Sequence, residues 1–278
     1  MGAFAGKKIL ISGGSKGIGR ATAVEFARDG AHVCVAARKQ DALDETVELM
    51  KAVATSGAVI TSVSMDVSDP DKAAAGVASA IEALGGLDVL VCNQGFAHCG
   101  KVHEVPIDDF RRLLDVNYLG HVYVARAAAP HLIAQESGTI VLVSSVLGYL
   151  STYGFSAYSG SKWAIVGFAE ALRQEMGLHG VKVRLFYPGT TETPGLENEN
   201  QDKPKVVWEM EGNSAFNVVR KPEDVALRLL KAVRGGLFEN PVGWDGWLTF
   251  LASRHAPWLV RMFNDSDLRK AVKKHGDA

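Results

Sequence analysis

Tyr158 and Lys162 are the residues whose types and spacing point most directly to chemistry. Four residues apart on a helix, they share one face. Free tyrosine and lysine side chains titrate near about 10 and about 10.4, and an ammonium beside a phenol lowers the pKa of the phenol. Such a tyrosine can donate a proton to a developing alkoxide. Ser145, at the end of an apolar segment, is placed to hydrogen-bond the same oxygen. A tyrosine–lysine pair at this spacing also occurs by chance in many helices.

A glycine-rich turn, Ser12 to Gly19, follows the first apolar segment and leads directly into a helical pattern. Glycines permit positive φ and a close approach of the backbone to a pyrophosphate, whose charge the helix N-terminus favours. The alternative is a tight turn that needs glycines only for its geometry. The position between a strand and a helix favours nucleotide binding. The expected contacts are Gly13, Ser15, Lys16, Gly17, Ile18 and Gly19.

The end of the second expected strand indicates which dinucleotide is used. NAD-preferring sites place a carboxylate there for the ribose hydroxyls, whereas this chain has Arg38 and Lys39 and no acid before Asp41. A cation at Arg38, together with Lys16 in the glycine turn, suits a 2′-phosphate. The alternative is that Arg38 and Lys39 are solvated surface charges. We predict NADPH as the cofactor.

Short apolar runs alternate with longer helical patterns, which is typical of βαβ units and a parallel sheet. The expected strands are Lys8–Ser12, His32–Ala36, Val59–Ser64, Val89–Asn93, Thr139–Ser144 and Lys182–Tyr187. The expected helices cover about 17–29, 41–56, 70–84, 107–134 and 156–178. Consecutive rather than alternating apolar residues indicate strands covered on both faces. The pattern predicts an α/β fold with a doubly wound, Rossmann-type parallel sheet.

We expect a single catalytic domain over residues 1–278, with a core at about 6–240. Residues 190–220 contain prolines, glycines and many polar residues, and we interpret them as a long loop or substrate-side lid. A further helix is expected near Pro222, where proline and acids occupy a first turn. An aromatic C-terminal extension follows at about 241–278.

Composition excludes several other classes. A net charge of −1 argues against nucleic acid as a partner. Cys34, Cys92 and Cys99 lack metal-ligand spacing, and the histidines share none, so no metal site is predicted. A strand so close to the start leaves no room for a signal peptide. The sequence has no apolar stretch long enough to predict a helix that spans a membrane. We therefore expect a cytoplasmic protein.

The order and separation of these motifs resemble the short-chain dehydrogenase/reductase superfamily over at least residues 8–195. The matching positions are the Ser12–Gly19 turn, Asp66-Val67, Asn93-Gln94-Gly95, Asn117, Ser144-Ser145, Tyr158 to Lys162, and Pro188-Gly189 with Thr193. The resemblance implies that Tyr158 is the general acid/base, that Ser145 polarises the carbonyl and that Lys162 holds the nicotinamide ribose.

The same resemblance implies further roles. Asn117 would hold a water that relays protons, and Asp66 and Val67 would flank the adenine. The remaining cofactor contacts would be Asn93, Gly95, Tyr158, Lys162, Pro188, Gly189, Thr191 and Thr193. Members of the superfamily commonly form dimers and tetramers through the helices near 107–134 and 156–178, so we expect a homodimer or homotetramer. Two positions depart from the family: Ser12 replaces a threonine, and Gln94 stands where alanine is usual.

Within the superfamily, the segments 116–120, 149–176 and 187–204, and Gly243-Trp244-Asp245-Gly246, are similar to 3-ketodihydrosphingosine reductases. This resemblance implies NADPH-dependent reduction of the 3-keto group of a long-chain sphingoid precursor. The alternatives are a reductase or dehydrogenase for another hydrophobic ketone or alcohol, of 3-oxoacyl or steroid type, and a nucleotide-sensing protein without turnover. The complete set of Asn117, Ser145, Tyr158 and Lys162 argues against the sensor.

A long alkyl chain needs an apolar groove, and the lid offers Leu196, Val206, Val207, Trp208, Met210 and Phe216. Glu197, Glu199 or Glu209 could meet a substrate ammonium, although for any single one of them a solvated loop charge is the favoured interpretation. Aromatic residues from Trp244 to Phe263 are interleaved with cations, which suits peripheral membrane contact. A packed C-terminal helix, an oligomer interface and part of the pocket wall remain alternatives, and Pro257 breaks any single long helix there.

Overall fold

The apolar segments form one parallel sheet in the computed structural model, which describes residues 2–201, 203–214 and 217–276. Its strands are β1 (Lys8–Ser12), β2 (His32–Ala37), β3 (Ile60–Ser64), β4 (Val89–Cys92), β5 (Gly138–Val143), β6 (Val181–Tyr187) and β7 (Glu239–Pro241). The strand order is β3-β2-β1-β4-β5-β6-β7, and neighbouring strands are parallel throughout. The predicted doubly wound sheet is confirmed. The order reverses between β1 and β4, where such sheets open a ligand crevice at their carboxyl ends.

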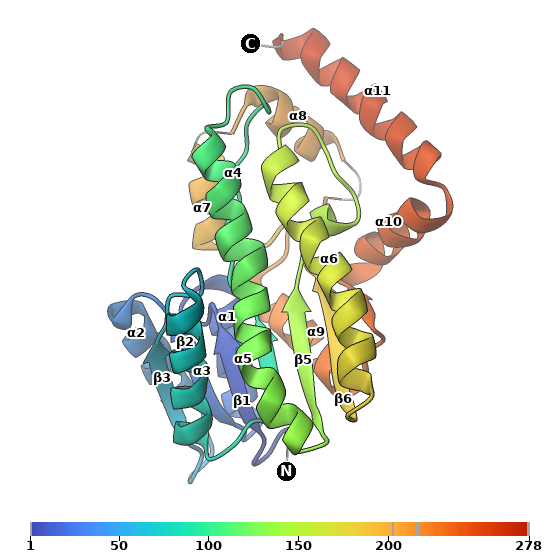
Figure 1. Cartoon of the computed structure of the whole chain (residues 1–278). Helices are drawn as coiled ribbons and strands as arrows, with labels where there is room; N and C mark the ends of the chain where they lie inside the picture. Colours follow the sequence, from blue (N-terminus) through green and yellow to red (C-terminus); the bar gives the residue numbers. More distant parts are fainter. Residues whose placement is uncertain (1, 202, 215–216, 277–278) are drawn as a thin grey trace.

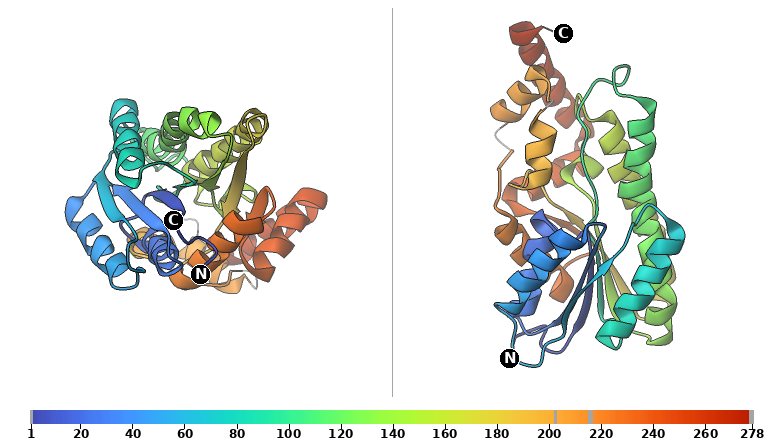
Figure 2. Two further views of the ribbon diagram at one scale, coloured as in Figure 1. Left: turned by 90° about the horizontal axis from the view of Figure 1, so that it is seen from below. Right: turned by 90° about the vertical axis from the view of Figure 1, so that its left-hand side faces the viewer.

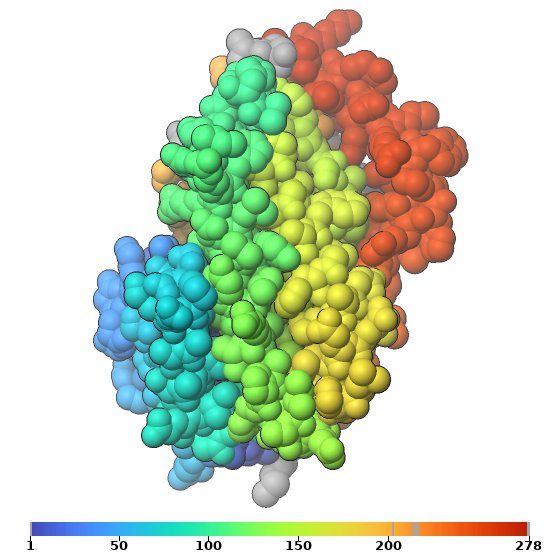
Figure 3. Space-filling model, in the orientation of Figure 1, coloured from blue at the N-terminus to red at the C-terminus, as the bar shows by residue number. Residues whose placement is uncertain are grey.

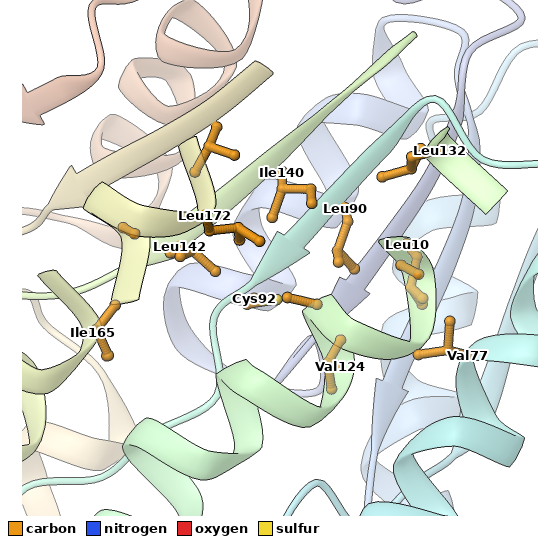
Figure 4. Close-up of a cluster of buried hydrophobic side chains, with 14 of the residues drawn as sticks. Leu10, Val77, Leu90, Cys92, Val124, Leu132, Ile140, Leu142, Ile165 and Leu172 are labelled. Atoms are coloured by element: carbon orange, nitrogen blue, oxygen red, sulfur yellow. The ribbon is translucent and has the colours of Figure 1, made fainter. Parts of the chain in front are cut away.

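Helices cover both faces of the sheet, as Figures 1 and 2 show. One face is covered by α3 (Pro70–Leu84), α5 (Gly120–Ala134) and α6 (Ser156–Gly177), and the other by α1 (Gly17–Arg28), α2 (Gln40–Lys51) and α9 (Pro222–Gly235). Figure 4 shows Leu90 and Ile140 of the sheet meeting Val124 of α5 and Leu172 of α6. These side chains are buried and belong to the larger of the two apolar clusters that lie on the faces of the sheet. Burial on both faces explains the consecutive apolar residues of the strands.

The expected helix over 107–134 is interrupted. It consists of α4 (Ile107–Leu113), a π-helical turn (Leu114–Leu119) and α5. Apolar periodicity does not reveal an added residue in one helical turn, so the sequence could not distinguish this from a continuous helix. π-Turns are frequent at functional sites, and this one contains Asn117.

The lid segment differs from the loop that was expected. Its residues form α7 (Pro194–Gln201) and α8 (Lys205–Asn213), each beginning at or just after a proline. Proline suits the start of a helix, because the amide that it lacks has no partner there; we had interpreted these prolines as breakers. Figures 1 and 2 show α7 and α8 above the carboxyl ends of the strands. Phe216, expected to line the lid, lies outside the described residues.

The C-terminal extension forms α10 (Gly243–His255) and α11 (Pro257–His275), with the predicted break at Pro257. α10 packs on the domain through Phe250, whose ring contacts Tyr149 and Tyr187. α11 reaches α8, where Lys274 pairs with Glu209 at 2.8 Å. Trp258, Met262 and Phe263 of α11 are exposed, and Figure 3 shows the α10–α11 ridge along one edge of the molecule.

The edge strand β7 was not predicted, because it has three residues and only Pro241 is buried. No helix within the described ranges combines the length and the apolar character that crossing a bilayer requires. The three cysteines are buried and unpaired. Among the residues that the structure describes, no cluster of histidine, cysteine or carboxylate side chains could bind a metal.

Candidate active site

Four side chains predicted to be catalytic come from three elements at the carboxyl edge of the sheet. Ser145 follows β5 and caps a short 3₁₀ turn by accepting a hydrogen bond from the Leu147 amide at 3.2 Å. Tyr158 and Lys162 lie on the first turns of α6, and Asn117 lies in the π-turn before α5. α6 is fixed to β5 because Ser144 Oγ donates to the Lys162 carbonyl at 3.0 Å. The structure thus brings these four residues together.

Tyr158 is half-buried and hydrogen-bonded to Ser145, and its ring lies 5.7 Å from Lys162 Nζ. Burial raises the pKa of Tyr158 to about 12, although the hydrogen bond with Ser145 opposes the rise. We had expected the neighbouring ammonium to lower this pKa. That expectation was wrong, because desolvation dominates and the Glu199 charge raises the pKa further. Tyr158 is therefore a protonated phenol at neutral pH, which is the form needed to donate a proton.

Lys162 is almost fully buried beneath the tyrosine. Burial lowers the pKa of Lys162 to about 7, because an ammonium loses its hydration there. Nζ donates to the Val143 carbonyl at 3.1 Å. A Cβ placed on Gly95 would stand 3.3 Å from Nζ, so glycine leaves the ammonium room at the cofactor side.

Asn117 is fully buried, and both polar atoms of its side chain are hydrogen-bonded. Oδ1 accepts from the Phe96 amide at 3.0 Å, and Nδ2 donates to the Phe96 carbonyl at 2.9 Å and to Ser161 Oγ at 3.0 Å. These contacts join the loop after β4 to α6.

The glycine turn is shaped for a close backbone approach. Gly13 and Gly17 have φ of 69° and 52°, where side chains are strained. A Cβ on Gly19 would collide with the Gly13 carbonyl and stand 2.6 Å from Asn93 Nδ2. Asn93 holds this turn by donating to the Gly13 carbonyl at 3.0 Å. Ser15, Lys16 and Ile18 complete the turn at the start of α1, with Lys16 exposed. The cradle fits a pyrophosphate, because the amides of the first turn of α1, which begins at Gly17, have no partner within the helix.

Residues after β6 close over this turn. A Cβ on Gly17 would stand 2.9 Å from the Thr193 methyl, so Thr193 lies directly above the cradle. Its hydroxyl accepts from the Leu196 amide at 3.2 Å and caps α7. Thr191 is buried and donates to the Gly189 carbonyl at 2.9 Å, and the Pro188 carbonyl accepts from the Val146 amide at 3.1 Å. This segment links the cradle, the Ser145 turn and the lid.

Arg38 and Lys39 are exposed at the end of β2, as a phosphate contact requires. Arg38 and Asp66 line an open pocket of about 370 Å³ whose wall includes Lys72 of α3. Burial raises the pKa of Asp66, but hydrogen bonds with Ser68 and the charges of Arg38 and Lys72 lower it overall. Val67 is buried against Gly120. Lys72 was missed by the sequence analysis, because nothing in helical spacing shows that α3 faces this edge.

An apolar wall adjoins Tyr158. Cys99, Phe155 and Val207 are buried together, with Leu147, Tyr153 and Tyr158 packed against them. The Phe155 and Tyr158 rings are 6.4 Å apart. Val207 belongs to α8, so the lid supplies part of the wall, as expected, whereas Trp208 is half-exposed.

A charged cluster with two acids and one base lies beside this wall. Lys203, with 1% of its side chain exposed, donates to Glu199 and Glu211 at 2.8 Å each. The Glu199 charge raises the pKa of both Tyr158 and Cys99. Of the three acids proposed for an ammonium, Glu197 is exposed and Glu209 is paired with Lys274 and His275. Lys203 and Glu211 were missed, although the four-residue spacing from Glu199 to Lys203 signals a pair.

The comparisons with known proteins identify the family of the chain. The short chain dehydrogenase family matches residues 7–204. The chain is 38% identical to the 3-ketodihydrosphingosine reductase of Mus musculus over 248 residues, which are 88% of this chain and 74% of the mouse protein. It is 36% identical to the 3-dehydrosphinganine reductase of Danio rerio, over 87% of this chain and 73% of that protein.

A solved structure has the same fold. The short-chain type dehydrogenase/reductase from Mycobacterium marinum superposes with a TM-score of 0.76 and 28% identity. The match covers 85% of this chain and 93% of the mycobacterial one. The match shows that the two chains share a fold over most of their length.

Proposed function

The chain belongs to the short-chain dehydrogenase/reductase family, and we propose that it is an NADPH-dependent reductase of 3-ketodihydrosphingosine. The observation that carries the proposal is the Ser145–Tyr158–Lys162 arrangement beside an apolar wall that the lid completes. The name of the mouse relative states the substrate, and the long alkyl chain of that substrate requires such a wall. Each buried methylene contributes about 0.8 kcal/mol.

The residues of this chain supply proton transfer and orientation. When bound, NADPH supplies the hydride that reaches the ketone carbon. Tyr158 gives its phenolic proton to the ketone oxygen, and Ser145 donates a hydrogen bond to the same oxygen. Lys162 stabilises the phenolate that remains and holds the nicotinamide ribose. The ketone gains one hydride and one proton and becomes a secondary alcohol.

We assign the rest of the cofactor site from its exposed groups. The glycine cradle takes the pyrophosphate, with Thr193 above it. Arg38 and Lys39 take the 2′-phosphate, supported by their exposure and by the lack of an acid at the end of β2. Lys72 adds positive charge to the same pocket.

Glu199 is our candidate for the substrate ammonium. 3-Ketodihydrosphingosine carries an amino group on the carbon next to its ketone, so the ammonium lies close to Tyr158 during reaction. The Glu199–Lys203–Glu211 cluster has one more acid than bases, and burial raises the pKa of Glu199 although Lys203 opposes the rise. Glu199 is also near enough to Tyr158 to change the pKa of the phenol. An added cation would balance the cluster.

Replacing Glu199 by glutamine is expected to raise the KM for 3-ketodihydrosphingosine about tenfold, the lower end for a charge-assisted hydrogen bond. A long-chain 3-ketone without the amino group should be unaffected. Glu197→Gln, an exposed acid on the same helix, is the matched control and should leave both KM values unchanged. Equal changes for the two ketones would remove Glu199 from ammonium binding.

The function itself is tested by measuring NADPH oxidation with 3-ketodihydrosphingosine, a 3-oxoacyl thioester and a steroid ketone. We expect turnover of the sphingoid ketone above that of the other two. Failure with the sphingoid ketone alone would overturn the substrate and leave the ketone-reductase chemistry intact.

We also propose that the enzyme is cytoplasmic and contacts membranes peripherally. The support for membrane contact is the exposure of Trp258 and Phe263 on α11, which alternate along the chain with Arg254 and Arg261. A homodimer or homotetramer through α4–α5 and α6 remains our expectation for its assembly, and Figure 3 shows these helices side by side on one face.

A further inference from the structure

A row of three buried polar side chains, from Ser12, Gln94 and His121, lies behind Lys162. Ser12 ends β1, Gln94 follows β4 and His121 lies on the first turn of α5. Ser12 Oγ donates to Gln94 Oε1, and Gln94 Nε2 lies 3.2 Å from His121 Nδ1. All three are at most 5% exposed. Burying polar groups costs free energy unless they are hydrogen-bonded. The hydrogen bonds within the row therefore hold these three side chains in a defined arrangement.

The row fixes the tautomer of His121. Gln94 Oε1 accepts from Ser12, so its NH₂ end faces the imidazole and can only donate. His121 Nδ1 is therefore the acceptor, and the imidazole proton lies on Nε2. Nε2 is buried, and no hydrogen bond to it is present in the part of the chain described.

His121 faces the group that holds Lys162. Burial and then the Lys162 ammonium lower the pKa of His121 to about 3, whereas the carbonyls of Cys92, Val143 and Asn117 raise it. The ionisable group that acts on the imidazole is thus Lys162 on α6, whereas Cys92 on β4 acts through its backbone carbonyl. His121 is neutral at any working pH. The Val143 carbonyl is shared, because it also accepts from Lys162 Nζ at 3.1 Å.

We propose that Gln94 and His121 are positioning residues that act through Lys162. The neutral imidazole lies beside the Val143 carbonyl that anchors Nζ, close enough to Lys162 for the two groups to interact. The remaining N–H groups of Nζ then face the Tyr158 side of the site. Gln94, anchored by Ser12, keeps the imidazole in its Nε2–H tautomer. The expected effect on kcat rests on the proposed ketone reduction. The expected tautomer of His121 does not.

The structural consequence is tested without turnover, by ¹H–¹⁵N spectra of the full chain labelled with ¹⁵N-histidine. We expect His121 as the neutral Nε2–H tautomer, with no titration at the ordinary histidine pKa of about 6.5. Gln94→Ala should abolish the single-tautomer signal, and Lys162→Met should raise the pKa of His121, because a like charge is removed. An Nδ1–H tautomer, or titration near the ordinary value, would overturn the proposal.

The kinetic consequence is tested with His121→Phe. We expect kcat to fall by up to about 100-fold, the effect of a small misplacement of a reacting group. KM and the Kd for NADPH should stay within twofold or so, and His121→Gln, which retains an N–H donor, should recover most of the loss. Gln94→Ala should lower kcat in the native protein but add little to His121→Phe, because both act through one contact.

His131→Phe is the matched control. His131 lies on the same helix, and its Nε2 is also buried without a hydrogen bond; kcat should be unchanged. Equal losses from His121→Phe and His131→Phe, or a Kd that rises in step with the loss of kcat, would overturn positioning. If His121→Phe does not fold, Gln94→Ala tests the proposal in the same way, by a fall in kcat with KM and the Kd for NADPH unchanged. If the native protein reduces no ketone, the proposed function fails, while the spectra still decide the inference.

Discussion

Replacing Tyr158 by phenylalanine is expected to lower the rate of ketone reduction at least about a thousand-fold, within the range for loss of a general acid. The variant loses the proton donor but keeps the ring that packs against Phe155. NADPH binding, measured by fluorescence titration, should change little, because the glycine cradle and Arg38 are untouched. The native rate should fall above about pH 7, where the Lys162 ammonium that stabilises the phenolate loses its proton, and again towards the raised pKa of Tyr158, since reduction uses the protonated phenol.

Tyr123→Phe is the control, because Tyr123 packs against the core on α5. It should retain turnover and melting temperature. Turnover by Tyr158→Phe at more than a tenth or so of the native rate would show that another group supplies the proton.

Arg38→Asp is expected to weaken NADPH binding roughly 100-fold, the upper range for a charge-assisted hydrogen bond. A carboxylate at the end of β2 repels a 2′-phosphate but accepts hydrogen bonds from the ribose hydroxyls of NADH. NADH binding should therefore be unchanged or stronger. Kd values for both cofactors, measured at one ionic strength, check the prediction.

Arg28→Asp provides the comparison for charge alone. Arg28 is an exposed arginine at the other end of α1, in a surface pair with Glu25, and the cradle lies at the start of that helix. This variant should bind both cofactors as the native protein does. Equal weakening of NADPH and NADH by Arg38→Asp would contradict a 2′-phosphate contact.

The sheet and the residues at its carboxyl edge could be predicted because each has a local signal. Apolar runs specify buried strands, glycines mark the turn after β1, and the four-residue spacing puts Tyr158 and Lys162 on one helix face. The structure brings Asn117 and Ser145 to the same place. Their roles in binding and catalysis remain predictions.

What the sequence did not reveal depends on contacts between distant segments. Gln94 and His121 are 27 residues apart and meet only because α5 packs on β4. The pKa of Tyr158 follows from burial by the whole fold, which the Lys162 spacing cannot indicate. The lid helices α7 and α8 could not be predicted from their prolines, because proline interrupts a helix in its interior but is also favoured at its first position.

The cluster beside the lid shows the same limit. Glu199 was one of three equivalent acids in the sequence, and only the structure separates them by their partners. Glu209 is bound by α11, Glu197 is solvated, and Glu199 lies near Tyr158.

Transfer of deuterium tests the central claim most directly. The full chain is incubated with 3-ketodihydrosphingosine and NADPH that carries deuterium on the transferred position of its nicotinamide, and the product is analysed by mass spectrometry. We predict dihydrosphingosine with one deuterium on C3, and no labelled product with Tyr158→Phe. An absence of labelled alcohol from the native protein, or a label on any other carbon, would contradict the account.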